Sequence, residues 1–523
     1  MQTDVRDGTD YSANFSYEID AFGGELSFDG FYVHTERTQN EDSIEYNEGI
    51  VDTDEIISLN DNDVEIEQDS FSLNGGYSFA NFGGETRIKA GFARFTNEAF
   101  EFEDEISYDG FPVIEEFEST LSQTDLTDEE FKFKVEHERD LSDTLSVEFG
   151  VHYENKEREN LVTEADEGVA VEDGDTIPSP IPPRGSFVTD ALEAVDGGDN
   201  TIERERIDPY VMLSGEAPGY QWELGLRYET TEVTITDRTV GESNSATYEA
   251  LLPSAHIKIP LTENDRLFAS VARTVRNPSF AFLSPAVLTG ELGDNDFRGN
   301  PFLEQERAWG VDVGYERRLG RTGVAGVNVF WRDVSDLIEV FNTGEEGDDG
   351  PGTFIYSARN TGEGQVWGIE FDLSSPLTIV GLPNTGVFVN YSWLDSDVQD
   401  EFGGRMFNSQ AESVFNVGFI HDIPTWGAAF GATYRDQGDA YSRVVAEEVT
   451  TLYGADLEVF VEKRLGERFT LRLTGSNLLD ETKDETFNKF DNAADQRTRD
   501  FDEYELETES AGPVFQLIGR LAF

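Results

Sequence analysis

The sequence lacks the residues that most protein metal and thiol sites require. It has no cysteine and only 3 methionines and 5 histidines among 523 residues. Without cysteine, disulfide bonds, thiol nucleophiles and cysteine metal sites are excluded, while the cellular compartment is left open. The histidines are dispersed, without the spacing of a pattern such as H-x-x-x-H, so we expect no histidine metal site; they are His34, His137, His152, His256 and His421.

Long apolar runs and basic residues are also scarce. No segment approaches the roughly 18–20 consecutive apolar residues of a membrane-spanning helix, which excludes helical spanning. The chain carries 38 Lys and Arg against 107 Asp and Glu, a formal net charge of −69. Nucleic-acid binding requires basic patches, so we expect no nucleic-acid partner. The sequence also has no G-x-S-x-G elbow and no phosphate-binding loop, and we expect no enzyme activity.

The first 20 residues contain no basic segment followed by an apolar core, so no secretion signal is visible. Instead, aromatic and small apolar residues alternate with polar ones from Tyr11 to Ile19, which is the period of a β-strand. We expect the chain to begin almost at once in a strand and to represent a mature or a trimmed form.

Alternating strands joined by short turns make up most of the chain, and the 39 phenylalanines and 49 glycines fit many short aromatic strands. Predicted hairpins pair 71–79 with 88–95, 131–137 with 145–153, 210–213 with 222–228, 251–259 with 267–273, and 308–316 with 324–331. Long polar segments at roughly 40–65, 98–127, 155–203 and 276–304 separate the hairpins and carry most of the acidic residues. Short turns at one end and long loops at the other are typical of a membrane-spanning β-barrel. We predict an all-β, antiparallel transmembrane barrel of about 20–22 strands, with short periplasmic turns and long acidic extracellular loops, as a single domain over residues 1–523.

Four motifs resemble the barrel of the TonB-dependent outer-membrane receptors. The first is the mid-barrel pattern, Val275-Arg276-Asn277-Pro278-Ser279-Phe280 followed by the segment from Gly299 to Trp309. The second is the strand motif from Phe330 to Ile338, and the third, Asn360–Gly364 continuing to Gly368-Ile369-Glu370, resembles the next strand. The fourth is Gly475-Ser476-Asn477-Leu478-Leu479-Asp480. Their order and spacing match the family, and the resemblance extends from about residue 130 to the end.

The resemblance implies a 22-stranded barrel in the outer membrane of a Gram-negative bacterium, with a plug domain inside it and a segment that contacts TonB. No plug domain is visible here, so TonB contact is expected only through a plug segment that this sequence does not contain. The chain would be an engineered fragment, a split gene product or an incomplete sequence. Expected partners are outer-membrane lipids, lipopolysaccharide and a small-molecule nutrient, and the barrel is expected to be monomeric.

The final residues resemble the signal by which outer-membrane barrels are recognised for insertion. Apolar residues alternate up to a terminal phenylalanine, and the signal residues are Phe515, Leu517, Leu521 and Phe523. An ordinary closing strand would show the same alternation, so this assignment depends on the barrel prediction.

The family resemblance implies uptake of a nutrient, and the acidic composition favours a neutral or cationic ligand. We expect an oligosaccharide first, with a siderophore or another metal complex as the alternative. The candidate ligand contacts are Tyr356, Trp393 and Tyr441, which could equally form the aromatic girdle of the barrel. A passive ungated channel and a surface adhesion barrel remain open. We expect no cofactor; Glu345–Gly350 and Asp395–Glu401 are candidate Ca²⁺ loops, although solvated acidic loops explain them as well.

Overall fold

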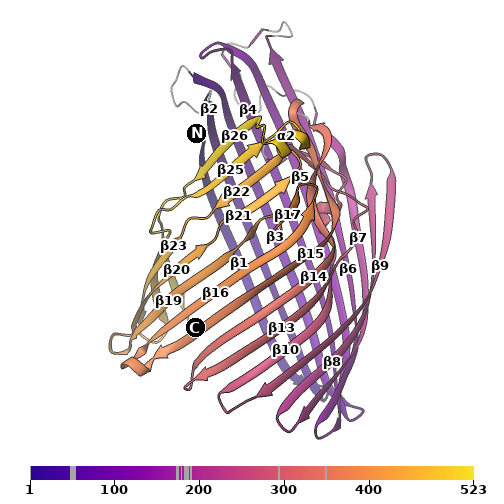
Figure 1. The fold of residues 1–523 in the computed structure, drawn as a ribbon, viewed down its shortest axis with the longest axis vertical. Coiled ribbons are helices and arrows are strands. Elements are labelled where there is room, and N and C mark those ends of the chain that lie inside the picture. Colours follow the sequence, from indigo (N-terminus) through magenta and orange to yellow (C-terminus); the bar gives the residue numbers. More distant parts are fainter. Residues whose placement is uncertain are drawn as a thin grey trace.

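The computed structural model describes residues 2–46, 55–171, 176–177, 180–181, 188, 191–292, 295–347 and 350–522. Antiparallel strands form almost all of this structure, in one 22-stranded sheet and one five-stranded sheet (Figure 1). No helix among the described residues is long and apolar enough to cross a membrane. The transmembrane antiparallel β-barrel architecture expected from the sequence is confirmed.

The large sheet is a ladder in which each strand pairs with the next along the chain. Three short strands, β11 (Val287–Leu292), β12 (Asn295–Arg298) and β17 (Gly403–Arg405), belong to the sheet without extending this ladder, so 22 minus 3 leaves 19 ladder strands. The ladder strands are β1 (Gln2–Ala21), β2 (Gly24–Tyr46), β3 (Ile56–Asn81), β4 (Gly84–Tyr108), β5 (Ile114–Ser142), β6 (Leu145–Ala170), β7 (Glu193–Ala217), β8 (Tyr220–Asp237), β9 (Glu242–Pro260), β10 (Asp265–Arg276), β13 (Glu306–Leu319), β14 (Gly323–Gly347), β15 (Gly350–Leu377), β16 (Leu382–Asp400), β19 (Ser413–Ile423), β20 (Ala428–Gln437), β23 (Asp456–Leu465), β24 (Phe469–Ser476) and β27 (Val514–Leu521).

Tight turns fix the hairpin register as the sequence predicted. At the β1–β2 and β3–β4 turns, a phenylalanine and a glycine both take positive φ: Phe22 (53°) and Gly23 (82°), then Phe82 (45°) and Gly83 (77°). Two consecutive positive-φ residues suit the twist of a two-residue hairpin connection. All five predicted hairpins form, as β3–β4, β5–β6, β7–β8, β9–β10 and β13–β14.

The long polar segments are mostly strand, and the prediction of long loops there was wrong in its extent. Strands β4 and β5 pair from Glu85↔Glu138 to Tyr108↔Ile114, which leaves only residues 109–113 as the turn between them. Similarly, β2 continues to Tyr46 and β6 to Ala170. Beyond the apolar part of the wall, acidic residues interrupt the hydrophobic pattern. Alternation survives only in short pieces, such as Phe100 and Phe102 against Glu101 and Glu103, while backbone pairing continues.

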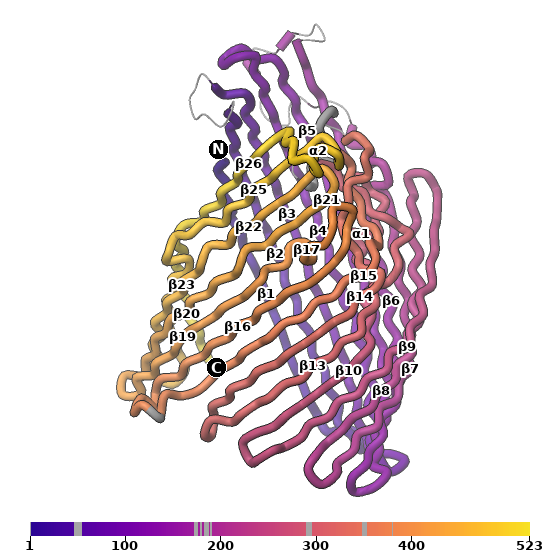
Figure 2. The backbone as a smooth tube through the Cα atoms, in the orientation of Figure 1, coloured from indigo at the N-terminus to yellow at the C-terminus, as the bar shows by residue number. Residues whose placement is uncertain are grey.

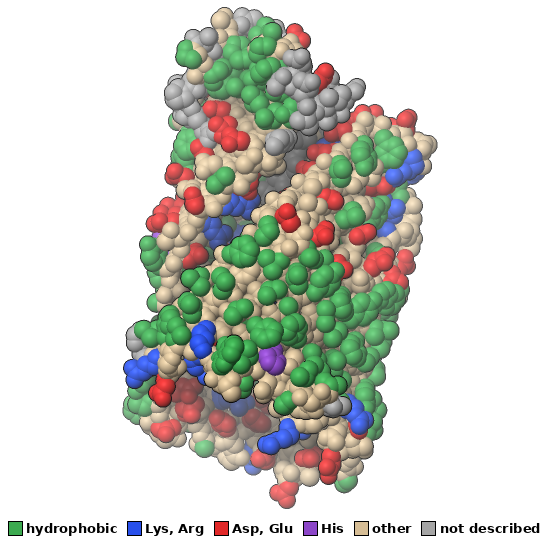
Figure 3. Space-filling view, turned by 90° about the vertical axis from the view of Figure 1, so that its left-hand side faces the viewer, with side chains coloured by type: hydrophobic (Ala, Val, Ile, Leu, Met, Phe, Trp, Pro, Cys, Tyr) green, Lys and Arg blue, Asp and Glu red, His purple; other side chains and the backbone are tan. Residues whose placement is uncertain are grey.

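The register assigns one face of the ladder to apolar side chains. Directly opposed residues share a face, and one such row runs Phe149–Val211–Leu226–Pro253 across β6 to β9. Another row contains Trp331 and Trp367, and apolar side chains spread widely over the outside of the wall in Figure 3. The alternate positions are small or charged. This is the outward-apolar, inward-polar pattern of a membrane barrel.

Both ends of the ladder are sheet edges among the described residues. Strand β1 pairs with β2 only, and β27 pairs with β24 only. Side chains of β1 are exposed along nearly its full length. In Figure 3 the face of the molecule that is turned toward the viewer is hollowed, and Lys and Arg side chains lie within this hollow.

The smaller sheet extends the wall at the end that carries the long connections. It contains β18 (Gln410–Ala411), β21 (Ala440–Val444), β22 (Glu447–Leu452), β25 (Lys483–Lys489) and β26 (Glu503–Glu509). Helix α2 (Ala493–Thr498) connects β25 to β26 and lies near the same end in Figure 2. Helix α1 (Phe280–Leu283) and two 3₁₀ turns, η3 (Thr378–Val380) and η4 (Pro424–Trp426), complete the described elements.

Candidate functional site on the inner face

The polar face of β4 to β8 carries an extended ion-pair network. The Arg87 guanidinium contacts Glu136 (2.8 Å), Glu138 (3.0 Å) and Glu148 (3.2 Å). The Tyr210 hydroxyl donates to Glu136 (2.8 Å) and lies 2.9 Å from Glu148. These residues alternate with outward apolar ones along their strands, so the hairpin register brings them together on the inner face.

A second group surrounds Asp208, which is fully buried. Its Oδ2 atom lies 3.0 Å from Arg206 Nε, 3.3 Å from Arg227 Nη1 and 3.4 Å from His152 Nδ1. Its other oxygen, Oδ1, is buried without a hydrogen-bond partner. A buried carboxylate requires compensating charge because desolvation opposes ionisation, and the two guanidinium groups supply it.

Helix α1 places an aromatic ring against this charged wall. Phe280 lies beneath three cations, with Lys156, Arg158 and Arg204 at 5.0–5.6 Å from the ring centroid. Ser279 caps the helix by accepting from Phe282 N. The cations are paired in turn, Arg158 with Asp128 (2.7 Å) and Arg204 with Glu154 (3.0 Å).

Residues of the mid-barrel motifs form a buried apolar cluster against the inner side of this wall. Phe280, Leu283 and Leu303 pack in one buried cluster with side chains of β7 to β9, which are Ile202, Val233, Ile235 and Tyr248. The buried Gln305 amide donates to Asn277 (2.6 Å). The segment between β10 and β13 is therefore anchored against the inner side of the wall, and the motif residues are structural as well as diagnostic.

Four arginine–carboxylate contacts tie the loop-bearing end to the wall. Arg405, only 5% exposed, binds Glu339 (2.8 Å) and Asp400 (2.9 Å), and Arg443 binds both Asp400 oxygens at 3.0 Å. Burial disfavours the charged form of Arg405, but its hydrogen bonds and ionic interactions with Glu339 and Asp400 together outweigh this effect and raise the pKa of the guanidinium. Asp400 belongs to one candidate Ca²⁺ loop, and in this structure arginines already compensate its charge.

The other candidate Ca²⁺ loop is only partly described. Glu345 forms an ion pair with Arg298 at 2.8 Å, while Asp348 and Asp349 lie outside the described residues. Calcium binding at either loop stays a prediction.

The three aromatic ligand candidates lie on different elements. Tyr356 on β15 is 4% exposed. Trp393 on β16 opposes Ile369 and lies in the outer apolar row. Tyr441 lies on β21 of the smaller sheet, where burial raises the pKa of its hydroxyl and the Glu448 carboxylate adds to the increase. Their role in ligand binding stays a prediction.

The C-terminal residues lie on the outer row of β27. Phe515 opposes Gly475, Leu517 opposes Leu473 and Leu521 opposes Phe469. Phe523 lies outside the described residues. Their role as an insertion signal stays a prediction.

The inner ion-pair network was missed by sequence reasoning. Its signal is present in Lys132, Lys134 and Glu136, which alternate with Phe131, Phe133 and Val135. The alternation identifies a strand with one polar face, but pairing of the charges depends on the register of five strands.

Comparison with known proteins is consistent with this architecture. Residues 2–478 match the family described as TonB dependent receptor-like, beta-barrel. Among curated proteins, no match to the chain was found.

Several solved structures share the fold at low sequence identity. The unliganded ferric citrate transporter FecA is 11% identical, with 99% of this chain and 77% of that chain covered and a TM-score of 0.60. The copper transporter OprC is 13% identical, with 99% and 79% covered and a TM-score of 0.56. The FrpB iron transporter from Neisseria meningitidis is 12% identical, with 98% and 82% covered and a TM-score of 0.51. From the family match over most of its length and from this shared fold, the chain belongs to the TonB-dependent receptor β-barrel family.

Proposed function

We propose that this chain forms the wall of a receptor that takes up a small-molecule nutrient through the outer membrane of a Gram-negative bacterium. The supporting observation is the division of the ladder into an apolar outer face and a charged inner face. The outer face would contact lipids and lipopolysaccharide around a monomeric barrel. Contact with TonB would be made by a plug segment and not by the described strands.

The inner wall favours a neutral, polar ligand of the oligosaccharide class. Three of its arginines have carboxylate partners: Arg87 has Glu136, Arg204 has Glu154 and Arg227 has Asp208. An anionic ligand would have to displace these carboxylate partners. The hydroxyl groups of a sugar can instead accept hydrogen bonds from the arginines and donate hydrogen bonds to the carboxylates without breaking the ion pairs. Tyr441 on the smaller sheet is the aromatic candidate suited to stacking, because Trp393 faces outward.

Ferric and copper complexes are the second candidate class. They are suggested by the names of the structurally similar ferric citrate and copper transporters. At 11–13% identity these similarities show the fold alone. The pairing of inner-wall arginines with carboxylates is therefore the stronger basis for the proposed ligand class.

The test is binding to the receptor in native outer membranes, using short neutral oligosaccharides and ferric citrate as probes. We expect oligosaccharide binding that persists at high salt, since screening weakens ionic recognition and not sugar stacking. Tyr441→Ala should weaken binding, and the matched control Tyr504→Ala should not. Salt-sensitive binding of ferric citrate without oligosaccharide binding would overturn the neutral-ligand proposal.

Uptake measurements separate the remaining functions. Uptake that stops when a protonophore collapses the inner-membrane gradient supports a TonB-driven receptor. Uptake that continues would indicate a passive channel. Binding without uptake would indicate an adhesion barrel.

A further inference from the structure

A cluster of potential metal ligands lies on the outer face of the wall, away from the inner ion-pair network. His34 on β2 directly opposes Asp69 on β3, and Glu36 opposes Glu67. The next residues toward the short turn on the same face, Tyr32 and Phe71, oppose each other and begin the apolar part of these strands. The cluster therefore lies where the apolar band ends, on the side of the long connections.

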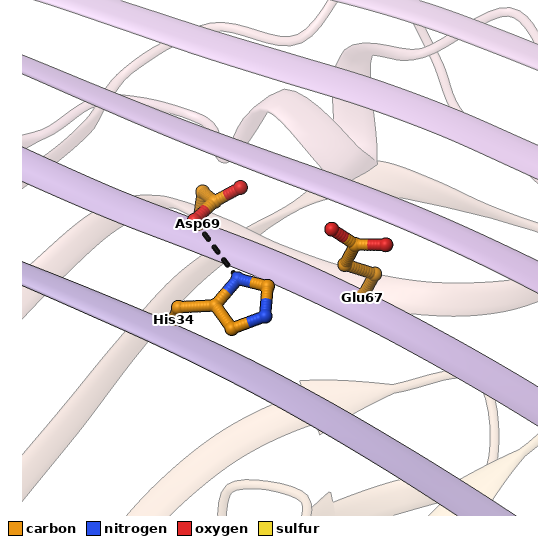
Figure 4. A group of neighbouring side chains, drawn as sticks. All are labelled: His34, Glu67 and Asp69. Carbon is orange, nitrogen blue, oxygen red and sulfur yellow. Dashed lines mark hydrogen bonds and ion pairs between the residues drawn. The ribbon is translucent and has the colours of Figure 1, made fainter. Parts of the chain in front are cut away.

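The potential ligand atoms of this cluster lie close together. In Figure 4 the His34 ring lies against Asp69, and Glu67 extends from the same strand as Asp69. Ligand atoms of His34, Glu67 and Asp69 all lie within 4.8 Å of one another. His34 Nδ1 is 3.1 Å from Asp69 Oδ1, and Nε2 is 3.3 Å from Glu36 Oε1.

The charge around the cluster is unbalanced. In the strand register Glu36 opposes Glu67, and Glu67 opposes Glu98 on β4. Like charges directly opposite one another destabilise a sheet, and a bound cation would remove that cost. Beside the cluster is a hollow of about 480 Å³ lined by Asp7, Glu36, Glu65, Glu67 and Glu98 with a single cationic residue, Arg37, so hydrated ions have access from solvent.

We propose that His34, Glu67 and Asp69 bind one divalent transition-metal ion of the Zn²⁺ class. One imidazole nitrogen with carboxylate oxygens is a donor set that Zn²⁺ accepts, whereas all-oxygen sites are the preference of Ca²⁺ and Mg²⁺. Water completes the coordination. The Tyr32 hydroxyl donates to Asp69 at 2.5 Å and orients that carboxylate from outside the coordination shell. Histidine spacing along the sequence did not indicate this site, because the ligands meet only across two strands.

The test is Zn²⁺ binding to the purified receptor in detergent, measured by equilibrium dialysis with metal analysis. We expect one Zn²⁺ bound per chain in competition with excess Ca²⁺, and an affinity reduced by more than about tenfold in His34→Ala and in Asp69→Asn. Co²⁺ should give a visible absorption band that His34→Ala abolishes. His256→Ala, which removes a histidine elsewhere in the wall, should bind Zn²⁺ as the wild type does.

Two results would overturn the assignment. One is Zn²⁺ binding that His34→Ala and Asp69→Asn leave unchanged. The other is displacement of Zn²⁺ by Ca²⁺ at comparable concentration, which would reduce the cluster to a diffuse acidic surface. The unfolding temperatures of the metal-free variants are compared with that of the metal-free wild type. Equal temperatures would confirm that neither substitution acts through misfolding.

Discussion

At the scale of single residues, the structure distinguishes charges that hold the molecule together from charges that are solvated. Arg405 is the clearest case, since its side chain is 5% exposed and bridges Glu339 on β14 and Asp400 on β16. From the sequence alone, Asp400 is one acidic residue among many in a polar stretch. Partial burial and two arginine partners, Arg405 and Arg443, make it structural.

Arg405→Ala should destabilise the loop-bearing end of the wall by about 3–5 kcal/mol, because two carboxylates would lose their shared buried partner. Arg405→Lys should recover part of the loss, since one ammonium replaces a two-sided guanidinium contact. The measurement is hydrogen exchange of the backbone amides of β17 and β21. Arg321→Ala, in the exposed β13–β14 turn, is the control. Unchanged exchange in Arg405→Ala would show that this ion-pair group contributes nothing to stability.

At the scale of elements, the Phe-Gly-Gly turns of β1–β2 and β3–β4 show how closely a hairpin approaches the strand next to it. The second glycine in each turn, Gly24 or Gly84, begins the return strand. A Cβ at Gly84 would lie 2.1 Å from the Glu138 carbonyl oxygen, and a Cβ at Gly24 would lie 2.2 Å from that of Ser78. These contacts involve backbone of the adjacent strand, so they cannot be relieved by a side-chain rotation.

Gly84→Ala should therefore lower stability by about 1–3 kcal/mol, a cost typical of overpacking, by separating the start of β4 from the end of β5, beside the β3–β4 turn. The control is Gly386→Ala in β16, where an added Cβ meets nothing within 4 Å. Thermal unfolding in detergent compares the two variants. Equal unfolding temperatures would contradict the close approach of β4 and β5.

At the scale of the whole molecule, the tryptophans report which face of the wall meets lipid. Five of the six lie on the outer face by register, Trp222, Trp309, Trp331, Trp367 and Trp393. The sixth, Trp426, lies in the η4 turn and is 70% exposed. Aromatic residues on the outside of a barrel gather near the membrane boundaries.

In reconstituted vesicles, brominated lipids should quench the fluorescence of a variant that retains only Trp331 more strongly than one that retains only Trp426. Aqueous iodide should show the reverse order, because Trp331 would be covered by acyl chains. Strong iodide quenching of Trp331 in the vesicles would contradict the assignment of the outer face.

The sequence by itself determined the antiparallel barrel architecture, the tight hairpins and the family. These follow from period-two alternation and from turn residues such as Phe22-Gly23 and Phe82-Gly83, which are local properties. It could not give the full extent of β4, β5 and β6, since these strands continue through acidic segments in which apolar residues alternate only in short, interrupted pieces.

Only the tertiary structure decided which charges meet. The grouping of Arg87 with Glu136 and Glu148, the burial of Asp208, and the convergence of His34 with Asp69 and Glu67 all depend on register between strands. A shift of one residue would reverse the face on which each side chain lies. Partners distant in sequence are therefore fixed by the pairing of whole strands, and no spacing along the chain records them.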